Sequence, residues 1–177
     1  YEKKTGKVRS LSFAGAAPKA LQAQEMTAET LQTGIKAGVI PGAFGGWIAV
    51  LDKFGKLSLK DVLEPAIEYA QQGHPIDPSI ADNILRQASA LQKFPTTAAI
   101  FLPNGRPPIG GELFRDLPLA QTFRKVVAGE QKALDEGKSR AEALQAAYDV
   151  FYKGEIAQEF DRFFKEQGGL ITAEDLR

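Results

Sequence analysis

Apolar residues recur at helical spacing through most of the chain. The two clearest stripes are Val62, Leu63, Ala66, Ile67 and Ala70, and then Ile156, Phe160, Phe163 and Phe164. Each stripe keeps one face of a 3.6-residue period apolar, which is typical of an amphipathic helix packed on a core. The pattern predicts that residues 14–177 are predominantly helical.

Capping and stop signals bound these helices. They predict helices that begin near Ala28, Phe44, Ser58, Pro78, Asp116, Ser139 and Glu155. Asp77 ahead of Pro78, and Ser139 three residues before Glu142, are N-terminal signatures. Glycines at 34, 55, 73 and 154 mark helix ends. Pro65 predicts a kink, or a helix start nearer residue 64.

Two stretches depart from the helical pattern. In residues 1–13, Thr5-Gly6 sits at a turn, and Val8, Ser10 and Ser12 then alternate with Arg9, Leu11 and Phe13, which predicts a β-hairpin. In residues 95–114, Pro103-Asn104-Gly105 predicts a turn between short extended pieces. The expected fold class is mainly α with an N-terminal β-hairpin. An unpaired hairpin edge favours self-association of the piece or disorder around it.

Composition narrows the class of protein. The chain has 177 residues, of which 44% are hydrophobic and 25% charged, as in ordinary globular domains. Its 22 basic and 22 acidic residues are interleaved, so no basic stripe points to a nucleic-acid partner. Without cysteine, thiolate nucleophiles and zinc–thiolate sites are excluded. No apolar run has the length needed to cross a membrane.

Candidate chemistry is sparse. The one histidine, His74, precedes a proline between two expected helices, and we interpret it as an ordinary loop residue. Asp61, Glu64 and Glu68 share a helix face and are interpreted as solvated charges, so no metal site is predicted. The pairs Phe151-Tyr152 and Phe163-Phe164 could stack on a ligand, but their helical spacing favours core packing.

The ends of the chain suggest a piece of a longer protein. Thr172 with Asp175 three residues on is a helix-start signature, yet the sequence stops at Arg177. We therefore expect residues 1–177 to be one segment of a larger polypeptide, whose chemistry can lie elsewhere.

The order of the punctuated segments is more telling than any single residue. "YEKKTGKV", "AAPKA", "GVIPGAFGGW", "LDKFGKLSLKDVLEPAIEYAQQGHPI", "FLPNGRPPIGGELF", "LAQTFRKVVAGE", "FYKGEIAQEF" and "QGGLITAEDL" follow one another. This succession resembles the middle of the large subunit of the gamma-glutamyltranspeptidase family. Only residues 128–147 look like an insertion.

The resemblance implies a partial large-subunit segment over residues 1–177 of an αββα N-terminal-nucleophile hydrolase. In that family a precursor cleaves itself, and the exposed threonine of the small subunit forms an acyl-enzyme with a small-molecule amide or peptide. No cofactor is implied, and no catalytic residue falls in this chain. The implied partners are the small subunit and the N-terminal part of the large subunit. The implied location is periplasmic or secreted.

One family site falls within the chain. Transpeptidases carry an Arg-Glu pair just before the "AP" motif, and its arginine holds the α-carboxylate of the γ-glutamyl group. In "LSFAGAAP" the two positions are Ala14 and Gly15. The resemblance therefore predicts altered acyl specificity for the parent protein and no activity for the isolated segment. Two alternatives stay open: a non-catalytic helical scaffold or binding module, and a family member that has lost self-processing.

Overall fold

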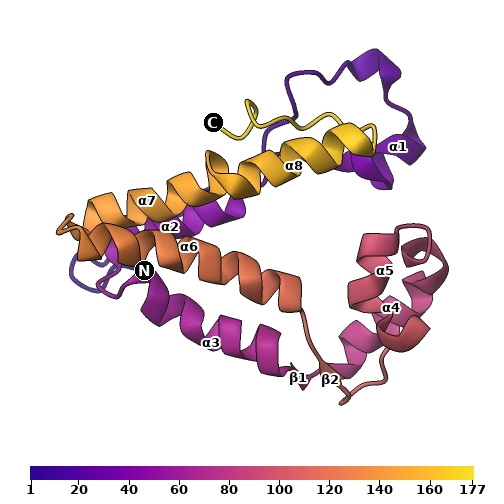
Figure 1. The fold of residues 1–177 in the computed structure, drawn as a ribbon, viewed down its shortest axis with the longest axis horizontal. Helices are drawn as coiled ribbons and strands as arrows, with labels where there is room; N and C mark the ends of the chain where they lie inside the picture. The colour runs from indigo at the N-terminus through magenta and orange to yellow at the C-terminus, as the bar shows by residue number, and fades with distance from the viewer. The chain divides into compact units, whose positions relative to one another are not determined.

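The computed structural model describes the backbone of residues 1–177 and every side chain except that of Glu25. The chain forms two compact units, one of Tyr1–Leu59 with Val126–Arg177 and one of Lys60–Lys125. We call the first the outer unit, because it holds both ends of the sequence, and the second the inner unit, because it holds the middle of the sequence (Figure 1).

Helices dominate both units, as predicted. The outer unit contains α1 (Ala28–Gln32), α2 (Ala43–Phe54), α7 (Arg140–Tyr152), α8 (Glu155–Glu166) and the end of α6 (Leu117–Asp135). The inner unit contains nearly all of α3 (Leu59–Gln72), strand β1 (His74–Pro75), α4 (Pro78–Leu91), α5 (Pro95–Phe101), strand β2 (Leu113–Phe114) and the start of α6.

Local caps fix several helix starts where the sequence placed them. The Asp77 carboxylate accepts the Ser79 N–H at 2.8 Å at the start of α4. Ser139 and Glu142 form a reciprocal capping box at α7. Asp116 accepts the Leu119 N–H at 3.0 Å at α6. These predictions are confirmed, because each cap needs only neighbours in sequence.

One helix start is confirmed and one helix prediction is wrong. The helix expected from Ser58 begins at Leu59 and runs through Pro65, so the alternative start nearer residue 64 does not occur. Burial of Leu63 and Ile67 along the same helix offsets the roughly 3 kcal/mol that an interior proline costs. Residues Pro95–Phe101, expected to be extended, form helix α5 with proline in its first turn.

The core of the inner unit explains why α5 forms. Ile76, Ala81, Ile84 and Leu102 are buried together, and Ala98 and Phe101 of α5 pack against them. A helix places both of these side chains on one face, so burial outweighs the extended propensity of the segment. The turn predicted at Pro103–Gly105 is confirmed, with Asn104 at φ 59° and Gly105 at φ 77°.

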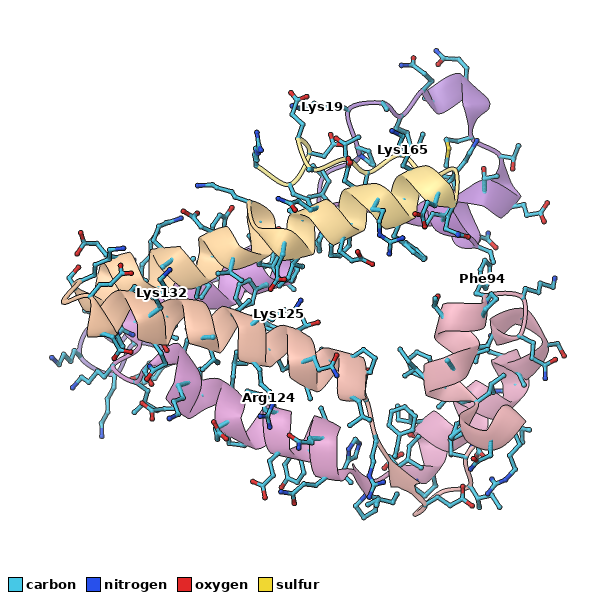
Figure 2. The ribbon with its side chains drawn as sticks, viewed as in Figure 1. Lys19, Phe94, Arg124, Lys125, Lys132 and Lys165 are labelled. Carbon is cyan, nitrogen blue, oxygen red and sulfur yellow. The ribbon has the colours of Figure 1, made fainter. Side chains whose placement is uncertain are left out.

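The inner unit also holds a small sheet that the sequence did not predict. Strands β1 and β2 pair antiparallel, with His74 opposite Phe114 and Pro75 opposite Leu113. Beside them, the Asp116 N–H donates to the Ala70 carbonyl at 2.9 Å. Arg124 of α6 donates to the Gln71 side chain of α3, between the two helices in Figure 2. These contacts bring the end of α3 to the start of α6.

The N-terminal hairpin is smaller than predicted. Glu2 and Lys7 form one antiparallel bridge across the expected turn, where Gly6 has φ 68°. Residues 8–13, which were expected to form a strand, have no regular secondary structure and belong to no sheet within the described residues. Alternating side chains do not hold a strand when no partner strand lies beside it. Arg9 instead lies over the Phe54 ring at 5.9 Å.

Aromatic side chains build the core of the outer unit. Phe44 of α2 stacks on Phe151 of α7 with ring centroids 5.0 Å apart. Phe160 and Phe164 of α8 stack at 6.1 Å. In Figure 1, α7 leads directly into α8, with α2 beside them. The aromatic pairs are therefore core packing, as the helical spacing predicted.

Residues 128–147 are also part of this core. They form the end of α6 and the start of α7, joined by a turn at Gly137 with φ 79°. Four of their apolar residues are buried: Ala133, Ala143, Leu144 and Ala147. The Arg140 guanidinium donates to the Leu51 carbonyl at 2.8 Å, where α2 ends. Residues 128–147 therefore pack in the core of the outer unit.

Candidate functional site

The predicted site positions lie on a stretch without regular secondary structure that runs along another loop. Residues Phe13–Lys19, which we call the acyl segment, lie against residues 39–42. The Ile40 N–H donates to the Ala16 carbonyl at 3.0 Å. Ala14 is exposed and Gly15 is half-buried. The two positions therefore have different surroundings, although they are adjacent in sequence.

Gly15 is where two backbones meet. A Cβ atom at this position would lie 1.9 Å from the Ile40 carbonyl oxygen and 3.0 Å from its carbon. Across the same contact, a Cβ on Gly42 would lie 2.5 Å from the Phe13 carbonyl oxygen. Carbonyl groups of a paired backbone cannot swing away as a side chain can. Packing thus explains the glycine at position 15, and a glutamate does not fit this backbone path.

The start of the acyl segment is anchored on α2. The Phe13 ring occupies the space beside Gly46, where a Cβ would lie 2.1 Å from the ring. The buried Tyr152 hydroxyl holds the same end of α2, because it donates to the Pro41 carbonyl at 2.7 Å and accepts the Gly45 N–H at 2.9 Å. Burial raises the pKa of Tyr152 against the opposing effect of Gly45, so the phenol keeps its proton and can donate.

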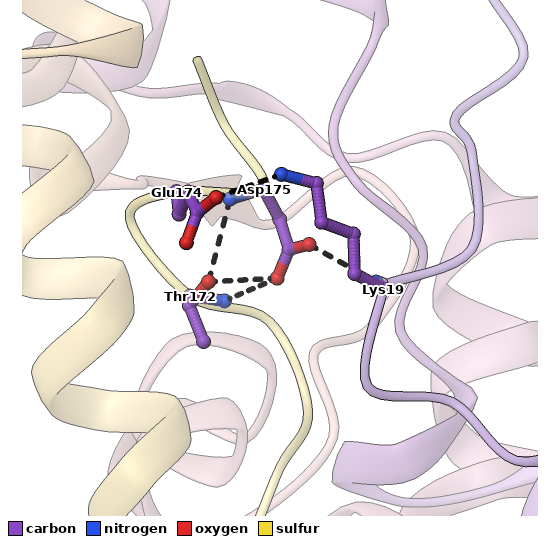
Figure 3. Close-up of polar contacts among 4 residues, drawn as sticks. All are labelled: Lys19, Thr172, Glu174 and Asp175. Atoms are coloured by element: carbon purple, nitrogen blue, oxygen red, sulfur yellow. Dashed lines mark hydrogen bonds and ion pairs between the residues drawn. The ribbon is translucent and has the colours of Figure 1, made fainter.

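The other end of the acyl segment is held by the C-terminal turn (Figure 3). The Lys19 N–H donates to Asp175 Oδ1 at 3.0 Å. Asp175 Oδ2 accepts the Thr172 N–H at 2.9 Å and the Thr172 hydroxyl at 2.8 Å. The Thr172–Asp175 pairing is therefore present, but it closes a turn over residues 173–176 and does not begin the helix that the sequence predicts. The Lys19–Asp175 hydrogen bond connects residues 156 positions apart in the sequence.

These hydrogen bonds also decide the charge state of Asp175. Burial is the largest single influence and acts to raise the pKa of this carboxyl group. Hydrogen bonds from Lys19 and Thr172 together outweigh burial, so the pKa lies below the ordinary aspartate value. Asp175 is therefore a carboxylate at neutral pH. The nearby Lys19–Glu174 ion pair at 3.1 Å is exposed and contributes little.

The remaining candidate residues belong to the inner unit. His74 lies exposed on β1, with its ring 6.2 Å from Tyr69 and 6.1 Å from Phe114. Asp61, Glu64 and Glu68 are exposed along α3. Across the described residues, no group of three or more His, Cys, Asp or Glu side chains could hold a metal ion.

Among the described residues the longest helix is α6, with 19 residues. None of their helices combines the length and apolar character that crossing a bilayer requires.

The fold and the motif order define the family. A family model described as gamma-glutamyltranspeptidase matches residues 1–177. The chain belongs to the gamma-glutamyltranspeptidase family.

Two curated relatives are each 32% identical to the chain. The glutathione hydrolase-like YwrD proenzyme of Bacillus subtilis matches over 138 residues, 78% of this chain and 23% of the relative. The acylase ACY 1 proenzyme of Pseudomonas sp. strain SE83 matches over 143 residues, 81% of this chain and 23% of the relative. The chain therefore spans about a quarter of the length of these proteins.

Solved structures agree with the family assignment. A cephalosporin acylase from Bacillus halodurans superposes with a TM-score of 0.73 at 26% identity, covering 93% of this chain and 30% of that one. The gamma-glutamyltranspeptidase of Helicobacter pylori gives a TM-score of 0.78 over 93% of this chain and 44% of its own, at 23% identity. The latter likeness concerns the fold alone.

Proposed function

We propose that the parent protein is an N-terminal-nucleophile amide hydrolase or acyltransferase whose acyl site prefers groups without the γ-glutamyl α-carboxylate. The observation that carries the proposal is the exposed Ala14 where transpeptidases of the family place an arginine. The nucleophilic threonine lies outside residues 1–177. The isolated segment is therefore expected to be inactive.

The physical argument concerns the charge of the acyl group. A guanidinium binds a carboxylate through two charge-assisted hydrogen bonds, and alanine offers neither. Hydrogen bonds to charged groups contribute about 1.5–3 kcal/mol, which is a factor of about 10 to 100 in binding. Without them an uncharged acyl group loses nothing, whereas a γ-glutamyl group loses its partner. The acylases among the relatives support this direction.

The proposal extends to partners and location. The small subunit and the remaining large-subunit residues would complete the sheet layers of the αββα fold, and the chemistry would need no cofactor. Export to the periplasm or the medium is proposed from the family resemblance.

The function is tested on the full-length protein with matched chromogenic amides. We expect hexanoyl-p-nitroanilide to be hydrolysed with a kcat/KM at least about tenfold higher than that of γ-glutamyl-p-nitroanilide, because only the second needs a cation at position 14. Preference for the γ-glutamyl amide would refute the altered specificity. Failure to hydrolyse either amide, together with an uncut precursor by mass spectrometry, would favour the alternative of a family member that has lost self-processing.

Restoring the cation gives a separate prediction. Ala14→Arg is expected to raise kcat/KM for the γ-glutamyl amide roughly tenfold and to leave the hexanoyl amide within about twofold. The exposed position accommodates a long side chain without repacking. Ala16→Arg, two residues along the same exposed stretch, is the positional control. Equal gains in both variants would indicate a general charge effect instead of a specific site.

A further inference from the structure

We propose that Asp175 is a positioning residue for acyl recognition, because its carboxylate fixes the exit of the acyl segment through the Lys19 backbone N–H. This inference rests on the proposed function of Ala14. It assigns a role in selectivity to the "GGLITAEDL" motif, which is remote in sequence from the acyl segment and supplies no group to the acyl site itself.

The acyl segment is held at three points along its length. Phe13 packs on Gly46 at its start, and the Ala16 carbonyl accepts the Ile40 N–H at 3.0 Å in its middle. The third point is the Lys19 N–H on Asp175 at 3.0 Å. Pro18 carries no N–H, so Lys19 supplies the first backbone donor after Ala17. Pro18 is also buried, so the C-terminal end of the acyl segment, which we call its exit, stays in place while the Lys19–Asp175 hydrogen bond lasts.

Asp175 is itself fixed before it meets the segment. Its second oxygen accepts two hydrogen bonds from Thr172. The next residue along, Ala173, donates its N–H to Asp161 of α8 at 3.0 Å. Ile171 and Leu176 on either side of the turn are only 2% and 3% exposed. The turn that carries Asp175 thus contacts α8 through Ala173 and the acyl segment through Asp175.

The two carboxylate oxygens of Asp175 accept hydrogen bonds from different residues. Oδ1 accepts the Lys19 N–H, and Oδ2 accepts the Thr172 N–H. An asparagine keeps one acceptor oxygen and points its amide donor at the other residue. Glu174, next to Asp175, has a side chain that is 79% exposed and pairs with the Lys19 ammonium at 3.1 Å. Glu174→Gln therefore removes a charge at the same place and leaves the backbone contact intact.

Releasing the exit of the segment should affect long acyl groups selectively. Under the proposed function, a γ-glutamyl-sized chain reaches position 14 with its far end, whereas an acetyl group is too short to do so. We expect Asp175→Ala in the full-length protein to raise the KM for hexanoyl-p-nitroanilide about fivefold, with kcat within about twofold. Turnover of acetyl-p-nitroanilide is expected to stay unchanged. Asp175→Asn is expected to fall between alanine and the wild type.

A second measurement does not depend on activity. Hydrogen exchange of the peptide covering residues 11–21 is expected to become about tenfold faster in Asp175→Ala and to stay unchanged in Glu174→Gln. Unchanged exchange in Asp175→Ala would overturn the proposal whatever the kinetics. Equal losses on the hexanoyl and acetyl amides would also overturn it, because they indicate a folding defect alone.

Failure of the proposed function gives a different result. In that case the wild-type protein prefers γ-glutamyl-p-nitroanilide or hydrolyses none of the three amides. The claim that Asp175 positions the acyl segment is then decided by the exchange measurement alone.

Discussion

Gly15→Ala is expected to destabilise the full-length protein by about 3 kcal/mol or more, at the high end of the cost of overpacking. The added methyl carbon would lie 1.9 Å from the Ile40 carbonyl oxygen, far inside van der Waals contact. Both sides of this contact are backbone, so no flexible side chain can move out of the way. The two backbone stretches are also held together, because the Ile40 N–H donates to the Ala16 carbonyl. One of the two backbone stretches must therefore move, and the hydrogen bond between them is strained or lost.

Urea denaturation and thermal unfolding of the variant would measure this loss. Ala14→Ser, at the neighbouring position, is the matched control. The Ala14 side chain is exposed, so this change is expected to cost less than about 0.5 kcal/mol. Equal stability of Gly15→Ala and Ala14→Ser would contradict the close approach of the acyl segment to Ile40.

This result bears on how the proposed acyl site would depart from the transpeptidase pattern that the resemblance implies. The sequence alone presents Ala14-Gly15 as one replaced pair, with small residues opening a pocket. The structure separates the two positions, because Gly15 has a packing reason and Ala14 does not. We therefore expect Ala14→Arg to be tolerated, while Gly15→Glu fails to fold normally. Restoring both residues of the pair should consequently give less γ-glutamyl activity than restoring the arginine alone.

Local chemistry was predictable from the sequence. Asp77, Asp116 and Ser139 cap helices through bonds to residues two or three positions away, so their roles need no tertiary information. The Thr172–Asp175 pair was predictable for the same reason. The family and its order of motifs were recognisable because they are properties of the sequence itself.

Contacts between distant residues were not predictable. Asp175 meets Lys19 across 156 positions, and Gly15 meets Ile40, with no periodic signal that links either pair. The sequence pattern does not predict helix α5, because this helix is stabilised by burial against α4 and not by the helix propensity of its own residues. The hairpin was overestimated for the opposite reason, since its alternating pattern has no partner strand within the described residues.

Glu130→Ala is expected to destabilise the full-length protein by about 3 kcal/mol. Glu130 lies on α6 and is only 1% exposed, although it is an acid. Its Oε1 accepts the N–H of Leu59, the first residue of α3, at 2.6 Å. Removal would leave a buried donor without this acceptor, costing about 1–3 kcal/mol, and would remove an anion from a helix N-terminus. The predicted Ser58–Asp61 cap of the same helix stays a prediction.

Two further variants separate the causes of this loss. Glu130→Gln keeps the volume and one oxygen acceptor, so it should cost only about 1 kcal/mol. Lys132→Ala, at an exposed position on the same helix, is expected to be nearly neutral (Figure 2). Urea midpoints of the three variants give the comparison. If Glu130→Gln is as unstable as Glu130→Ala, the negative charge at the start of α3 matters more than the hydrogen bond. If neither differs from Lys132→Ala, Glu130 does not stabilise the start of α3.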